Sequence, residues 1–211
     1  MCNRARFAGE PETLLAMFDA IWSAERPRDN RFNPAELVPR NRAYVIRNDA
    51  GRRALDIMSW DVLGGTARFP MTNVRQLHLP QWRRLAEDPA HRCLIPLTEF
   101  CEWAPIATDL DDGKKPVKGE MWFRPTDQDV FAVAGFWRLT GEQRGFAMVT
   151  CDPNAVVAPV HPKAMITVLD PADHERWLSG DYDDVLALQR PYPAEHMSVR
   201  GPVFPTRGRG G

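Results

Sequence analysis

Apolar runs that suit β-strands, interrupted by glycine, proline and charged residues, constrain the fold of this chain more than any other feature. Strands are predicted at 43–48, 54–63, 92–103, 120–125, 129–139, 145–152 and at the end of 160–169. Helices are predicted at 11–23, 80–88, 171–180 and 182–190. Because the helices do not alternate with the strands as in βαβ units, the pattern predicts an α+β fold built on an antiparallel sheet or barrel.

The size of the chain favours one domain. It has 211 residues, of which 44% are hydrophobic, enough for one sizeable core. We expect this domain at 1–203 and a disordered Gly/Arg-rich tail at 204–211. An irregular segment is predicted at 64–73 and a charged surface loop at 107–120.

Two prolines mark predicted element ends. The helix at 11–23 starts with Pro11 and carries Leu14, Phe18 and Ile21 along one face. The strand at 92–103 contains Pro96, where we expect a break because proline has no backbone N–H to donate.

Charge is unevenly divided along the chain, although the net charge is −1. Residues 1–92 hold 15 Arg against 11 acidic residues, whereas residues 93–211 hold 12 basic and 17 acidic residues. Arginine makes up 23 of the 27 basic residues, and its guanidinium pairs bidentately with phosphate. The arginine-rich half is therefore a candidate nucleic-acid surface. A GC-rich genome that favours arginine over lysine is the equally weighted alternative.

The spacing of the cysteines, and the lack of secretory, membrane-spanning and phosphate-binding motifs, limit the classes of function. Cys2, Cys93, Cys101 and Cys151 form no CxxC pair, and the chain has no secretory signal or long apolar run. We expect a cytoplasmic protein with reduced thiols, no membrane contact and no metal, the last three cysteines being buried in the core. Phosphate loops of the Walker and Rossmann types are absent, which disfavours nucleotide-driven chemistry and a bound cofactor.

Cys2 is the first candidate for chemistry because it follows Met1 directly. If Met1 is removed, Cys2 carries a free α-amine and a thiol on adjacent carbons, and both are partly unprotonated near neutral pH. Such a pair traps an aldehyde, since the amine forms an imine and the thiol closes a thiazolidine ring. A thiol without a chemical role is the alternative, and Cys2 considered alone favours it.

Two further residues suit proton transfer. His161 lies in a proline-flanked polar stretch between apolar runs, whereas the other four histidines lie in contexts that predict exposure. Glu102 lies between a cysteine and a tryptophan in an apolar strand, and a buried glutamate is usually paired or functional. Glu99 in the same run is its competitor. A structural or surface role is the alternative for His161.

Asn73 ends the irregular segment at 64–73, and Arg75 follows two residues later. An asparagine side chain can hold an amine or a sugar hydroxyl, and Arg75 can hold a phosphate. An ordinary turn or helix-capping asparagine is the alternative.

Taken in order, these elements resemble one family. The matching stretches are MCNRARF, FNPAELVPR, MSWDVLG, TNVRQL, RCLIPLTEFCEW, VAGFWR and VTCDPNAVVAPVHPKAMITVL followed by ERWL. They resemble the SRAP (SOS response-associated peptidase) family, which shields abasic sites in single-stranded DNA. No single stretch is decisive, but the ordered set of seven, from Met1 to about Leu178, is specific.

The resemblance implies a fold, a partner and a covalent mechanism. The fold is a single compact domain with a β-barrel-like core and flanking helices. Cys2 would cross-link to the aldehyde of an abasic site in single-stranded DNA, Asn73 would orient the amine or the sugar, and Glu102 and His161 would move protons. The implied DNA-binding residues are Arg4, Pro39, Arg40, Arg75, Trp103 and Lys163. We expect a monomer without a cofactor.

The chain departs from the family pattern near these residues. Asn3 stands where the family has glycine, Cys101 where it has tyrosine, and Lys163 where it has arginine. Lysine replaces a bidentate fork with a point charge. These departures bear on affinity and on the preferred DNA structure more than on the chemistry.

Two other functions remain open. Cys2 and His161 could act as a cysteine peptidase on the chain itself or on a peptide. A non-covalent single-strand-binding module would instead use basic residues for phosphates and tryptophans for stacking. The candidate stacking residues are Trp60, Trp82, Trp103, Trp122 and Trp137. Core packing is the preferred interpretation for Trp22, Trp122 and Trp137.

Overall fold

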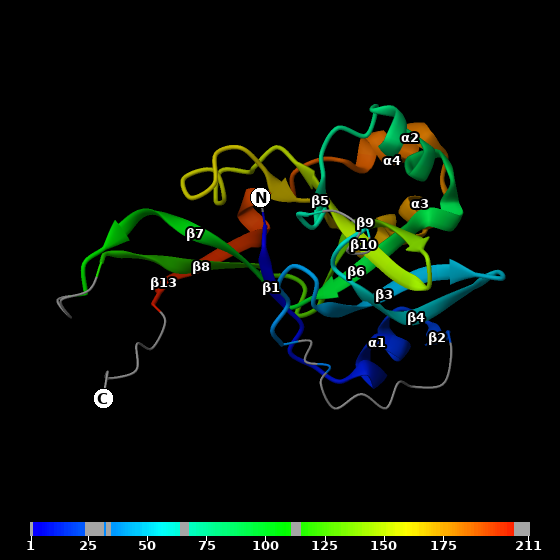
Figure 1. Ribbon diagram of the computed structural model, residues 1–211, viewed down its shortest axis with the longest axis horizontal. Coiled ribbons are helices and arrows are strands. Elements are labelled where there is room, and N and C mark those ends of the chain that lie inside the picture. The colour runs from blue at the N-terminus through cyan, green and yellow to red at the C-terminus, as the bar shows by residue number, and fades with distance from the viewer. Residues whose placement is uncertain (1, 24–31, 33–34, 64–67, 111–114, 205–211) are drawn as a thin grey trace.

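Two sheets make up most of the molecule. The computed structural model describes residues 2–23, 32, 35–63, 68–110 and 115–204 (Figure 1). The larger sheet contains β2 (Ala20–Trp22), β3 (Arg42–Asp49), β4 (Arg52–Ser59), β5 (Asn73–Val74), β6 (Arg92–Leu97), β9 (Phe131–Thr140), β10 (Gln143–Cys151), β11 (Met165–Ile166) and β12 (Val168–Leu169). The smaller sheet has the order β1 (Arg4–Arg6), β7 (Glu99–Thr108), β8 (Val117–Pro125), β13 (Met197–Val203).

Five strands of the larger sheet close into a barrel. Their pairings run β10–β4–β3–β6–β9 and return to β10. The closing contact pairs Gly145 with Ser59 in parallel. A Cβ at position 145 would overlap the carbonyl oxygen of Asp61, so only glycine allows this approach. The expected α+β fold with a barrel-like core is confirmed, although β4–β10, β2–β4 and β5–β10 are parallel.

Alternating strand residues divide between two apolar clusters. Ile46, Leu94 and Ala134 belong to the cluster that also contains Trp177 of a covering helix. Their neighbours belong to a second cluster, which includes Val45, Ile95, Val133 and Cys2. Because successive residues of a barrel strand point alternately outward and inward, the helix-free second cluster fills the barrel and continues beneath the smaller sheet. Cys2 therefore adjoins the barrel interior.

Four helices cover the outside of the barrel. They are α1 (Pro11–Met17), α2 (Pro80–Glu87), α3 (His174–Ser179) and α4 (Tyr182–Leu188), with short 3-10 turns at Pro89–His91, Pro171–Asp173 and Ala194–His196. Figure 1 shows α2, α3 and α4 gathered at one end and the smaller sheet extending away on the opposite side. No helix in the described part of the chain is long and apolar enough to cross a membrane.

The helix predicted at 11–23 is too long. It ends at Met17, and Asp19 adopts a left-handed backbone with φ 48° before strand β2 begins. Ile21 is 53% exposed instead of lying on a buried face. The parallel pairing of β2 with β4 decides the conformation of this segment, and local helical spacing cannot register that long-range contact.

Several strand ends also differ from the prediction. The break in 92–103 falls at Thr98, between β6 and β7, whereas Pro96 lies within β6. Pro96 is tolerated there because the β3–β6 ladder is confined to Ile46↔Leu94, so no ladder bond is lost. The loop predicted at 107–120 is shorter, since β7 extends to Thr108 and β8 begins at Val117.

Strand β13 is not predicted from the sequence, because Gly201 and Pro202 interrupt its strand-like pattern of residues. These residues are tolerated at a sheet edge. Residues 205–211 of the expected disordered tail lie outside the described residues.

Candidate active site

Strand β1 fixes the start of the chain along both of its edges. It pairs with β7 in the register Arg4↔Cys101. On its other side, Ala5 exchanges two backbone hydrogen bonds with Leu37. Cys2, two residues before β1, is therefore held in place, although chain ends commonly fray.

A charged and aromatic cluster strengthens this anchorage. The guanidinium carbon of Arg6 lies 4.0 Å from the ring centre of Trp122, and that of Arg200 lies 5.8 Å from it. Glu99 pairs with Arg6 at 2.6 Å and with Arg200 at 3.0 Å. The cluster joins β1, β7, β8 and β13. The sequence carries no signal for it, because the register of four separate strands brings these side chains together.

The Cys2 thiol is buried, with 2% of the residue exposed. Its Sγ lies 3.3 Å from the carbonyl oxygen of Arg4 and 3.8 Å from that of Cys101. Burial and, to a smaller extent, the negative charge of Glu102 raise the pKa of the thiol well above its usual range. The thiol is therefore protonated at neutral pH, and a base must take its proton before it can act as a nucleophile.

Asn73 contacts Cys2 directly. Its Nδ2 donates hydrogen bonds to the carbonyl oxygen of Cys2 and to Oγ1 of Thr72, each at 2.9 Å. Strand β5, which carries Asn73, pairs with β10 at Met148. The carbonyl of Thr72 accepts a further bond from the Trp60 indole. Asn73 Oδ1 is buried without a hydrogen-bond partner among the described residues.

Glu102, not its competitor Glu99, is the isolated carboxyl group. Glu102 is 4% exposed, and its Oε1 is buried without a hydrogen-bond donor in the described part of the chain. Burial raises the pKa of Glu102, and the nearby charge of His161 partly opposes this. Burial also acts on Glu99, but hydrogen bonds from Arg200 and Arg6 outweigh it and lower the pKa of Glu99.

His161 is oriented by its own turn. Its backbone N–H donates to the carbonyl of Val157. Its Nδ1 lies 2.7 Å from the carbonyl oxygen of Ala164 and 3.3 Å from the N–H of Ala164. The shorter contact requires a proton on Nδ1, so Nε2 carries the lone pair when the ring is neutral. The charge of His161 also acts on Glu102, which places the two side chains near each other.

The cationic residues expected to bind DNA are partly occupied by acidic partners. Arg4 pairs with Glu120 at 3.1 Å and Arg40 with Asp61 at 3.6 Å. The sequence analysis did not single out either acid. Lys163 is exposed two residues after His161.

Of the five tryptophans considered for stacking on bases, only Trp103 is well exposed. Trp103, beside Glu102, is 45% exposed, and Pro39 lies half-buried in a turn. The prediction that Trp60 and Trp82 could stack on bases is wrong, because both side chains are buried in the core. Of the tryptophans expected to pack in the core, Trp122 is buried and Trp22 and Trp137 are half-buried.

Several arginines of the basic half of the chain, residues 1–92, form ion pairs with acidic residues of the other half. Arginines before position 93 pair with acids after it, as in Arg4–Glu120, Arg6–Glu99, Arg53–Glu175 and Arg75–Asp152. The opposite charges of the two halves therefore help to join them within the fold. Composition alone consequently does not locate a phosphate-binding surface.

The remaining histidine and cysteine predictions have different outcomes. His174 was expected to be exposed but is buried and stacked on Phe18, with ring centres 5.4 Å apart. The predicted burial of Cys93, Cys101 and Cys151 is confirmed, and none of the described cysteines forms a disulfide. Within the described ranges, no three His, Cys, Asp or Glu side chains form a group that could hold a metal.

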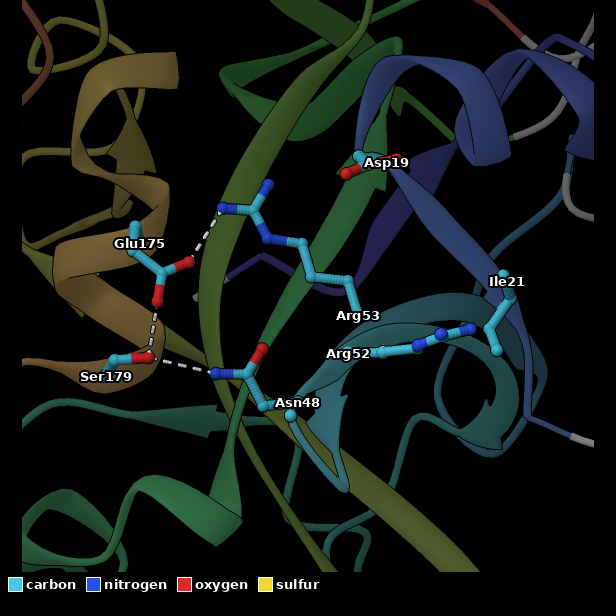
Figure 2. Close-up of a pocket in the computed structure, with 8 residues that line it drawn as sticks. Asp19, Ile21, Asn48, Arg52, Arg53, Glu175 and Ser179 are labelled. Carbon is cyan, nitrogen blue, oxygen red and sulfur yellow. Dashed lines mark hydrogen bonds and ion pairs between the residues drawn. The ribbon is translucent and has the colours of Figure 1, made fainter.

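A well-formed cavity lies elsewhere. It has a volume of about 640 Å³ and is lined by Asp19, Ile21, Asn48, Gly51, Arg52, Arg53, Glu175 and Ser179 (Figure 2). Figure 2 shows one wall joined in a chain, in which Asn48 donates to Ser179, Ser179 donates to Glu175, and Arg53 pairs with Glu175. None of the sequence-predicted site residues lines this cavity. We therefore place the candidate active site at Cys2, beside the unpaired polar atoms of Asn73 and Glu102.

A family model matches residues 1–203, almost the whole chain. Its description is "SOS response associated peptidase (SRAP)". The chain belongs to the SRAP family. The resemblance stated from the ordered stretches is therefore confirmed. No curated protein matches this SRAP chain.

Solved structures share the SRAP chain's fold. A Bordetella bronchiseptica protein is 21% identical with a TM-score of 0.71, covering 94% of this chain and 98% of its own. A Bacteroides thetaiotaomicron protein is 17% identical with a TM-score of 0.76, covering 97% of each chain. A phage-related protein from Bordetella bronchiseptica is 20% identical with a TM-score of 0.70, covering 94% of this chain and 93% of its own. At these identities the likeness extends to the fold alone.

Proposed function

We propose that this chain forms a covalent cross-link with abasic sites in single-stranded DNA through Cys2, once Met1 has been removed. The single observation that carries the proposal is the convergence on Cys2 of Asn73, which bonds its carbonyl, and of the buried carboxyl of Glu102, which acts on its thiol. Asn73 and Glu102 each leave one buried oxygen without a donor among the described residues. An α-amine on Cys2 supplies N–H donors next to these acceptors.

The reaction needs no oxidant or reductant. The Cys2 amine adds to the C1′ aldehyde of the ring-opened deoxyribose, and the resulting carbinolamine loses water to give a Schiff base. The thiol sulfur then adds to the imine carbon while the imine nitrogen gains a proton. The product is a thiazolidine, and the net change is the loss of one water molecule.

The neighbouring residues divide the proton transfers. Asn73 orients the Cys2 backbone so that the amine faces the aldehyde. Glu102, whose pKa is raised by burial, gives a proton to the departing hydroxyl. His161 takes the thiol proton through Nε2 and returns it when the cross-link reverses. Arg4, Pro39, Arg40, Trp103 and Lys163 would guide the strand.

The decisive experiment uses a single-stranded oligonucleotide with one abasic site and separates products on a denaturing gel. We expect a shifted band with the wild-type chain and none with Cys2→Ala. With Cys2→Ser, we expect a Schiff base that only borohydride makes permanent, since the hydroxyl replaces the thiol. A tetrahydrofuran analogue, which has no aldehyde, should give no cross-link. A retained Met1 in the cross-linking protein, detected by intact mass, would contradict the mechanism.

The same variants, in a DNA-binding assay and a peptide-cleavage assay, test the two alternatives. Salt-sensitive binding without a cross-link would favour the non-covalent module, for which Trp103 is the exposed aromatic residue. Cleavage of a peptide, lost in both Cys2→Ala and His161→Gln, would favour the peptidase that the family description names.

A further inference from the structure

The side-chain amide of Asn73 is held by two acceptors, and the second of them is the hydroxyl of Thr72. Nδ2 donates to the carbonyl oxygen of Cys2 and to Oγ1 of Thr72, each at 2.9 Å. An amide nitrogen carries two hydrogens, one for each of these bonds. One backbone group and one hydroxyl therefore fix both the plane and the direction of the Asn73 amide.

The Cys2 carbonyl decides which atom of the amide faces it. A carbonyl oxygen can only accept a hydrogen bond, so Nδ2 and not Oδ1 must lie against it. The Thr72 hydroxyl completes this arrangement, because the second amide hydrogen would otherwise be buried without an acceptor. Oδ1 is then left on the other side of the amide, where it is buried without a donor among the described residues.

The backbone of Thr72 is in turn held by the barrel. Its carbonyl accepts hydrogen bonds from the Trp60 indole and from the backbone N–H of Met148 in β10, each at 2.9 Å. Trp60 and Met148 are fully buried, and Thr72 is 7% exposed. The Thr72 hydroxyl is therefore a fixed acceptor beneath the surface, and an uncharged buried side chain does not suit contact with DNA phosphates.

We infer that Thr72 is a positioning residue, which holds the Asn73 amide so that Oδ1 is the atom open to the reaction centre. The orientation of the amide follows from the contacts with Cys2 and Thr72, whereas its effect on rate rests on the proposed function. Oδ1 would accept an N–H of the Cys2 α-amine and leave the amine lone pair for the aldehyde carbon. A rotated amide would instead donate to that lone pair and oppose its attack.

The test compares Thr72→Val and Thr72→Ser with Thr150→Val as the matched control. Valine keeps the branched shape of threonine but removes the acceptor, whereas serine keeps the acceptor. Thr150 is 2% exposed, and its hydroxyl donates to the carbonyl of Val74, the residue after Asn73, at 3.3 Å. Thr150→Val therefore removes a buried hydroxyl bond to the same strand but no partner of the Asn73 amide. Circular dichroism and thermal melting establish that each variant is folded.

We expect Thr72→Val to slow single-turnover cross-linking by about 10- to 100-fold, because small displacements of reacting groups have effects of this size. Thr72→Ser and Thr150→Val should stay close to the wild-type rate. Affinity for tetrahydrofuran-containing DNA should be the same in all these proteins, since neither threonine is exposed. The double variant Thr72→Val/Asn73→Ala should be no slower than Asn73→Ala alone, because Thr72 acts through Asn73.

A role in stability alone gives a different pattern. Thr72→Val and Thr150→Val would then both lower the melting temperature and both cross-link at the same rate as each other. An unchanged cross-linking rate in Thr72→Val therefore overturns the inference. Equal slowing in Thr72→Val and Thr150→Val, or slowing that serine does not restore, overturns it as well.

A readout without DNA separates this inference from the proposed function. The two side-chain amide proton resonances of Asn73, identified by their loss in Asn73→Ala, report its two hydrogen bonds in the NMR spectrum. One of them should move upfield in Thr72→Val, and both should stay near their wild-type positions in Thr72→Ser and Thr150→Val. If the wild-type chain forms no cross-link but the resonance moves, the proposed function fails and the positioning of the amide stands. Unmoved resonances in Thr72→Val overturn the inference whatever the cross-linking result.

Discussion

The surroundings of Cys2 and the cavity of Figure 2 are both polar, but their hydrogen bonding differs. Around the cavity, Asn48, Ser179, Glu175 and Arg53 satisfy one another in a continuous chain. Around Cys2, Asn73 Oδ1 and Glu102 Oε1 are buried without donors among the described residues. A buried polar atom without a partner costs free energy. The proposed chemistry at Cys2 therefore coincides with unpaired buried atoms, whereas the polar groups around the cavity are paired.

The largest expected difference lies between two glutamates. Glu102→Gln should slow cross-linking by about 100- to 10,000-fold, since the carboxyl is the proposed proton donor in a buried site. Glu175→Gln should leave the rate unchanged and cost no more than about 1 kcal/mol of stability, because its ion pair with Arg53 is largely exposed. Single-turnover rates and urea unfolding measure the two effects. Equal cross-linking rates in Glu102→Gln and Glu175→Gln would contradict the placement of the chemistry at Cys2 and not at the cavity.

The next largest expected effect is the pH dependence of stability that His174 causes. Burial, assisted by the charge of Arg53, lowers the pKa of His174 from 6.5 to about 4. Between these values the unfolded chain binds more protons than the folded one. The free energy of unfolding should therefore fall by about 3 kcal/mol as the pH drops from 6.5 to 4.

His174→Phe, which keeps an aromatic ring against Phe18, should remove this part of the pH dependence. Urea unfolding of both proteins across this pH range measures the difference. Parallel curves for the two proteins would contradict the burial of a neutral His174.

Asn73 and Asn48 form a matched pair of smaller effect. Asn73→Ala removes a buried hydrogen bond to the Cys2 carbonyl and should cost about 1–3 kcal/mol of stability. Asn48→Ala removes an exposed bond to Ser179 and should cost about 0.5–1 kcal/mol. Thermal and urea unfolding measure both. Similar costs would mean that the Cys2 region is no more tightly organised than the cavity wall.

Glu99 should show the smallest effect. Its lowered pKa means that its ion pairs stabilise the fold above the unfolded-state pKa of about 4.5 and lose this effect as the pH falls through the lowered folded-state pKa. Glu99→Gln should cost less than about 1 kcal/mol at pH 7, because Gln can still accept hydrogen bonds from Arg6 and Arg200, which are partly exposed. The difference from the wild type should vanish at low pH. A difference that grows on acidification would contradict the assigned sign.

The sequence by itself determined the class of fold, the main barrel strands, the helices at 80–88 and 182–190, and the family. Strand and helix periodicities are local, and an ordered set of short stretches identifies a relative without reference to their contacts. It also singled out Glu102 and Glu99 as competitors in one strand. The structure distinguished them, because only contacts with β1 and β13 pair Glu99 with Arg6 and Arg200.

Only the tertiary structure decided where these local elements meet. The parallel closure at Gly145 and Ser59, the conversion of 20–22 into strand β2, and the engagement of Arg75 with Lys163 all join segments far apart in the chain. Local patterns carry no information about such pairings, since the same residues form different contacts in another register. The sequence therefore singled out Cys2 as a candidate reactive residue, and the fold determined which side chains surround it.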